Sequence, residues 1–115
     1  MLQRQQTVWL AHQLDERWGL PRITQGTGMP AEEAYALRLP SLGDFLDYAR
    51  KVWASTDRYL DALTMEELSR IIKVNPFGEI PVLQALGQIL IAHGNQHLGE
   101  IWLTRELQGL KGVGF

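Results

Sequence analysis

The stretch PVLQALGQILIAHGNQHLGEIWLTRELQ, residues 81–108, decides the fold class of this chain. Pro81 suits the first position of a helix, and Gly109, directly after the stretch, is a typical helix stop. The first half of the stretch is apolar on nearly every side. These features predict one long helix that needs packing partners on more than one face.

Three glycines lie inside this predicted helix: Gly87, Gly94 and Gly99. Each costs about 1 kcal/mol of helix stability relative to alanine. We interpret them as positions where another helix or a bound group comes close. The tail over residues 109–115 is expected to be loose.

Upstream, a second long helix is predicted to begin at Ser41 and to continue to Leu63. Ser41 followed by Asp44 resembles a capping box. An apolar stripe then recurs at three- to four-residue spacing, with charged residues on the opposite face. This helix is expected to bury one side only.

A third helix is predicted over residues 5–18, where apolar residues recur at helical spacing and Gly19 supplies a stop. Residues 20–40 are rich in glycine and proline. They predict a long loop with at most one helical turn, over residues 30–37.

The segment before the last helix is short and mixed in character. Thr64 and Glu67 form a second capping box, which predicts a short helical turn over residues 65–70. Two short apolar runs then flank the turn sequence Asn75-Pro76-Phe77-Gly78. They fit either a small hairpin or an irregular crossover.

The composition bounds the class of protein. With 115 residues, 45% of them hydrophobic, the chain is expected to form a single globular domain over residues 1–115. The three predicted helices make this domain all-α. The net charge of −2 and the lack of any Lys/Arg run argue against nucleic-acid binding. No membrane span or signal peptide is recognisable, so we expect a cytoplasmic protein.

The chain contains no cysteine. This excludes disulfides, thiolate metal ligands and a cysteine nucleophile. It also fits a reducing compartment.

The two histidines of the last helix are the best candidates for chemistry. His93 and His97 are four residues apart, which places both imidazoles on one helix face within reach of one metal ion. They continue an apolar stripe, so both are expected to face the core. The alternative is two polar residues satisfied by backbone or solvent. Position 94 is glycine, so the general base of a His-Glu-x-x-His peptidase is missing.

His12 is the third histidine of the chain and the partner that the pair would need. Three protein ligands on a divalent ion leave one position open for water or substrate. The alternative is a surface imidazole paired with Asp15 or Glu16. Glu100 lies three residues after His97 and is expected either to orient its ring or to be solvated.

The chain resembles the DinB-like superfamily, which includes YfiT-like metal-dependent hydrolases and thiol S-transferases. The resemblance rests on Thr7-Val-Trp-Leu-Ala-His12, on the capped amphipathic helix, and on His93-Gly-Asn-Gln-His97-Leu-Gly99. It implies an up-down four-helix bundle with a long crossover. It also implies a divalent zinc, nickel or iron ion bound by His12, His93 and His97, a low-molecular-weight thiol as cosubstrate, and a homodimer.

Two features depart from the family pattern. Only eleven residues precede His12, so the first bundle helix is expected to be missing, truncated or supplied by a partner chain. Gly94 stands where the family often has an acidic or bulky residue. Two functions therefore stay open: a metal-dependent S-transferase or hydrolase acting on a small molecule, or a non-enzymatic dimeric bundle with a weak or vacant metal site.

Overall fold

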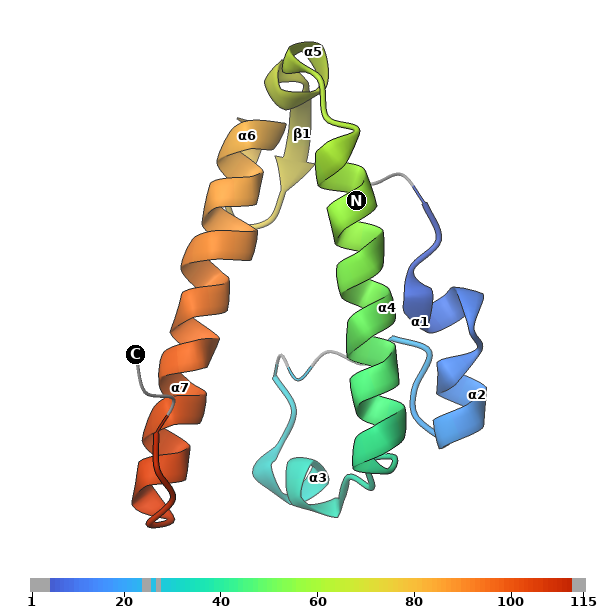
Figure 1. Ribbon diagram of the computed structural model, residues 1–115, viewed down its shortest axis with the longest axis vertical. Helices are drawn as coiled ribbons and strands as arrows, with labels where there is room; N and C mark the ends of the chain where they lie inside the picture. The colour runs from blue at the N-terminus through green and yellow to red at the C-terminus, as the bar shows by residue number, and fades with distance from the viewer. Residues whose placement is uncertain (1–4, 24–25, 27, 113–115) are drawn as a thin grey trace. The chain divides into compact units, whose positions relative to one another are not determined.

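The computed structural model describes residues 5–23, 26 and 28–112. They form two compact units, an N-terminal unit that ends at Ala62 and a C-terminal unit that begins at Leu63. Both units are mainly helical, and the sheet found among the described residues has two strands (Figure 1). The all-α prediction is confirmed, with one small hairpin added.

The N-terminal unit begins with two short helices, α1 (Val8–Ala11) and α2 (Leu14–Trp18). The prediction of one continuous helix over residues 5–18 is therefore wrong. Gln13 adopts a left-handed conformation with φ of 50° and breaks the helix. The break turns Leu14 into the core, where it is 5% exposed, so tertiary packing overrides the local helical pattern.

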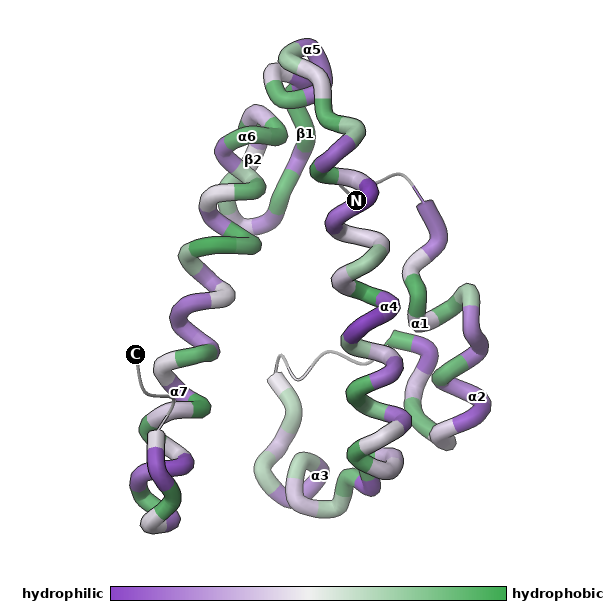
Figure 2. The backbone as a smooth tube through the Cα atoms, in the orientation of Figure 1, coloured by the Kyte–Doolittle hydropathy of each residue, from purple (hydrophilic) through white to green (hydrophobic). Residues whose placement is uncertain are grey.

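After a loop, α3 (Ala31–Ala36) forms the single helical turn that the sequence predicts for residues 30–37. The long helix α4 (Leu42–Asp61) follows. The Ser41 hydroxyl accepts a hydrogen bond from the Asp44 backbone N–H at 3.1 Å, which confirms the predicted cap. Figure 2 shows apolar and polar residues in alternating short runs along α4, as expected for a helix with one apolar face.

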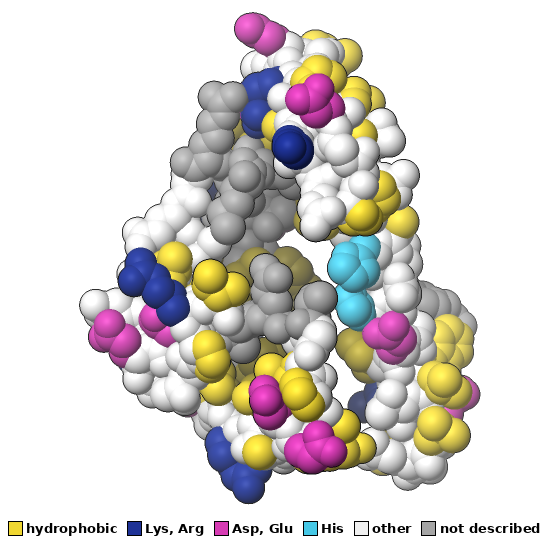
Figure 3. Space-filling view, turned by 180° about the vertical axis from the view of Figure 1, so that it is seen from behind, with side chains coloured by type: hydrophobic (Ala, Val, Ile, Leu, Met, Phe, Trp, Pro, Cys, Tyr) yellow, Lys and Arg dark blue, Asp and Glu magenta, His cyan; other side chains and the backbone are white. Residues whose placement is uncertain are grey.

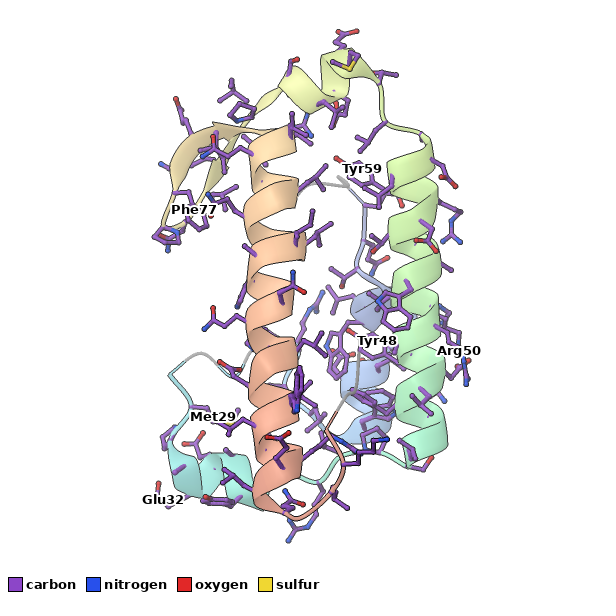
Figure 4. The ribbon with its side chains drawn as sticks, turned by 60° about the vertical axis from the view of Figure 1, so that its left-hand side comes forward. Met29, Glu32, Tyr48, Arg50, Tyr59 and Phe77 are labelled. Carbon is purple, nitrogen blue, oxygen red and sulfur yellow. The ribbon has the colours of Figure 1, made fainter. Side chains whose placement is uncertain are left out.

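An aromatic cluster joins α1, α2 and α4. The Trp9, Trp18 and Tyr48 rings meet edge to face, with centroids 5.5–5.9 Å apart. Tyr48 lies on α4, where Figure 4 labels it. This geometry is the one that aromatic quadrupoles favour, so the cluster fixes the two short helices against the long one.

The C-terminal unit begins with α5 (Met65–Ser69), which Thr64 caps by accepting from the Glu67 N–H at 3.2 Å. Strands β1 (Ile71–Val74) and β2 (Gly78–Pro81) then pair in antiparallel register. The connection is therefore a hairpin, one of the two alternatives that the sequence left open. Gly78 supplies the positive φ of 80° at the end of the turn.

The last helical segment consists of α6 (Val82–Ala85), the π-helical segment η1 (Leu86–Ala92) and α7 (His93–Leu107), without interruption. The predicted long helix is confirmed, although Pro81 is its N-cap and not its first residue. The π-helical segment was not expected. The hairpin and α6 share the core of this unit, which consists of the buried side chains Ile80, Val82, Ala85 and Leu86.

Residues 109–112, which follow α7, contact this helix, contrary to the loose tail that was expected. Gly109 has φ of 70° and reverses the chain. The Arg105 guanidinium then donates to the Lys111 carbonyl at 3.0 Å. The Trp102 indole occupies the place where a side chain at Gly112 would stand, so only glycine permits this approach. The rest of the predicted tail lies outside the described residues.

None of the helices in the described part of the chain is both long enough and apolar enough to cross a membrane.

Candidate metal centre

His93 and His97 lie together on the first turns of α7. Their ring centroids are 4.5 Å apart and the ring planes are tilted by 41°. The prediction that the two imidazoles share one helix face is therefore confirmed. Two imidazoles so close can both direct a nitrogen toward one ion.

Both imidazoles are exposed, and α7 has no buried residue among those described. The core of the C-terminal unit therefore does not include them, and their predicted place in the core of a bundle stays a prediction. The π-helical segment η1 directly precedes His93, and its i→i+5 hydrogen bonds interrupt the 3.6-residue period of the helix. Figure 3 shows histidine side chains at the surface, with an acidic side chain beside them.

Glu100 holds the ring of His97. The His97 Nδ1 atom lies 2.8 Å from the Glu100 Oε2 atom, and the Gln96 amide lies 3.5 Å from the other carboxylate oxygen. The hydrogen bond with His97 is the main cause that lowers the pKa of Glu100, so the carboxylate is charged at neutral pH. The predicted orienting role of Glu100 is present as a contact, and it leaves Nε2 of His97 free to bind a ligand.

His12 belongs to the N-terminal unit, at the C-cap of α1 and directly before the left-handed Gln13. It is exposed, and among the described residues no hydrogen bond or ion pair joins it to Asp15 or Glu16. The alternative of a surface pair with either carboxylate is therefore not seen.

A small polar pocket of about 20 Å³ contains His12, and α4 contributes Asp44, Asp47 and Lys51 to its lining. The Lys51 ammonium donates to the Asp47 carboxylate at 2.5 Å. This hydrogen bond is the main cause that lowers the pKa of Asp47, and His12 contributes a smaller charge effect. The volume suffices for one water molecule. No sequence pattern indicates this acidic neighbour of His12, because its position depends on how α1 packs on α4.

The three predicted ligands fall in two units. His12 lies in the N-terminal unit, whereas His93 and His97 lie in the C-terminal unit. Within the part of the chain that the structure describes, no group of three or more His, Cys, Asp or Glu side chains is arranged to hold a metal ion. The structure thus brings together the histidine pair and Glu100, and the complete three-histidine site stays a prediction.

The fold and the site define a class of protein: a mainly helical chain with a capped long helix and a His-x-x-x-His pair on its last helix. The sequence model of the DinB superfamily matches residues 4–101, and the chain belongs to this superfamily. No curated protein and no solved structure matches the chain significantly.

Proposed function

We propose that the chain binds one divalent metal ion through His12, His93 and His97 and acts as a thiol S-transferase or hydrolase. The observation that carries this proposal is the 4.5 Å separation of the His93 and His97 rings. Membership of the DinB superfamily supports it, since the family resemblance implies such a site.

The contact between Glu100 and His97 supports the proposal, because it favours the tautomer of His97 that carries its proton on Nδ1. A proton on Nδ1, donated to the carboxylate at 2.8 Å, leaves the Nε2 lone pair for a metal. A neutral imidazole is the form that binds a divalent ion. The donor set therefore fits zinc, nickel or iron.

The chemistry that follows is nucleophile activation. His12, His93 and His97 would hold the ion, which would supply the lowered pKa of a water or thiol bound beside it. The chain itself contains no cysteine, so the thiol of an S-transferase must come from a small cosubstrate.

A second candidate is a non-enzymatic homodimer in which the histidines bind metal weakly or not at all. Exposed apolar side chains along the last helical segment favour it: Leu83 is 61% exposed, Ile91 64% and Leu103 58%. Apolar surface of this kind is typical of an interface. Sedimentation of a compact monomer at micromolar concentration would contradict the dimer.

The two functions differ in metal content. We expect untagged protein to contain about one ion per chain and its melting temperature to rise with added zinc or nickel, since a ligand that binds only the native state stabilises it. His93→Ala and His12→Ala should each abolish both effects. An unchanged melting temperature in the wild type, with no bound metal, would leave only the non-enzymatic dimer.

A further inference from the structure

The N-terminal unit contains a pocket of about 440 Å³ beside the candidate ligand His12. We propose that this pocket binds a small amphipathic carboxylate, a molecule with an aromatic or branched apolar body and one anionic group. Ligand sites for small molecules usually have volumes of about 300–1,000 Å³, so the pocket has a suitable size.

The walls of the pocket are mainly apolar. The aromatic side chains among them are Trp9, Trp18, Phe45 and Tyr48. The edge-to-face contacts of Trp9 and Trp18 with Tyr48 hold three of these rings in place. A rigid aromatic wall favours an apolar ligand body, because little ordering is needed on binding.

The polar groups at the pocket favour an anion. Of the described residues that line it, Arg22 is the charged one, and no carboxylate is among them. The Trp9 indole N–H donates to the Arg22 carbonyl at 3.1 Å, which fixes the backbone of Arg22 at the pocket wall. Its guanidinium makes no hydrogen bond or ion pair with another described residue.

A guanidinium with no partner among the described residues is suited to a bidentate carboxylate. Tyr48 supplies a further donor, because burial raises the pKa of its hydroxyl and keeps it protonated. The Thr7 hydroxyl, in contrast, already accepts from the Leu10 N–H at 3.4 Å and caps α1. A cation would find no counter-charge among the described lining residues.

The pocket adjoins the candidate metal ligand. Trp18 and Tyr48 line both the apolar pocket and the small polar pocket that contains His12. That this ligand is the substrate rests on the proposed function, whereas its binding does not require a metal.

The test compares two probes with the same apolar body, the carboxylate 4-phenylbutyrate and the uncharged alcohol 4-phenylbutan-1-ol, titrated into the full chain in the presence of EDTA. Tryptophan fluorescence and calorimetry report binding. We expect the carboxylate to bind about tenfold more tightly than the alcohol, the factor typical of one charged hydrogen-bonded contact. In Arg22→Gln the two probes should bind equally, whereas the matched control Arg58→Gln should keep the preference.

Leu39→Ser provides a second variant, since Leu39 lines the pocket and is 68% exposed, so the change should disturb the core little. It should weaken both probes alike. Equal affinity of the probes for the wild type, an Arg22→Gln variant that keeps the preference, or no binding at all would overturn the proposal. Because EDTA is present, these results do not depend on the metal, and a failure to bind zinc in a separate titration would contradict only the proposed function.

Discussion

The Nδ1 atom of His97 lies 2.8 Å from a carboxylate oxygen of Glu100, one helical turn further along α7. This contact fixes one ring of the histidine pair and determines which nitrogen is available. Outer-shell carboxylates of this kind raise the basicity of a ligating imidazole. The contact therefore matters for metal affinity more than for folding.

Glu100→Gln is expected to weaken zinc binding by about 10- to 100-fold, the usual effect of losing such a partner. The side chain of Glu100 is 59% exposed, so the free energy of unfolding of the metal-free protein should change little. Competition with a chromophoric chelator measures the affinity, and Glu66→Gln is the matched control. An unchanged zinc affinity would show that Glu100 has no role in ligand orientation.

The same hydrogen bond predicts a pH dependence. Because the pKa of Glu100 is lowered, mainly by His97, the stabilisation from this contact is complete at neutral pH and is lost as the pH falls through the lowered pKa. Carbon-13 NMR of the Glu100 carboxyl should give a midpoint below that of free glutamate. In His97→Ala the midpoint should return toward the ordinary value, and a midpoint that stays low would assign the shift to another group.

Local sequence patterns predicted the parts of the fold that depend on neighbouring residues. The caps at Ser41 and Thr64 form as expected because each involves atoms only three residues apart. The His93–His97 contact follows from helical spacing in the same way. The hairpin was one of two open alternatives, and Gly78 decides the turn.

Other features depend on contacts between elements, and local patterns could not reveal them. Residues 5–18 have no glycine or proline near the break at Gln13, which forms because Leu14 becomes buried. The π-helical period of η1 could not be predicted, because the residues there are apolar on nearly all sides of the helix and show no clear periodicity. The neighbourhood of His12 and Asp47 requires the packing of α1 on α4.

The Ser41 cap gives a direct test of the long helix α4. Ser41→Ala removes the acceptor of the Asp44 N–H and should lower the free energy of unfolding by about 1 kcal/mol. Ser41→Asn keeps an acceptor at the N-cap and an N–H donor for the Asp44 carboxylate, which the Ser41 hydroxyl contacts at 2.6 Å, and should retain most of the stability. Urea unfolding followed by circular dichroism measures both variants. Equal losses in the two variants would mean that the hydroxyl does not act as a cap.

A substitution at Gln13 tests the break between α1 and α2, which determines the position of His12. A side chain at φ of 50° costs about 1 kcal/mol, which glycine does not incur. Gln13→Gly should therefore leave the protein as stable or up to about 1 kcal/mol more stable, although glycine also increases the entropy of the unfolded chain. Gln84→Gly, at an exposed position inside α6, should instead cost about 1 kcal/mol. Changes of opposite sign in the free energy of unfolding of the two variants, measured in urea, would establish that the backbone at residue 13 is in the left-handed region. Equal losses would mean that α1 and α2 form one continuous helix, and that the surroundings of His12 differ from those described above.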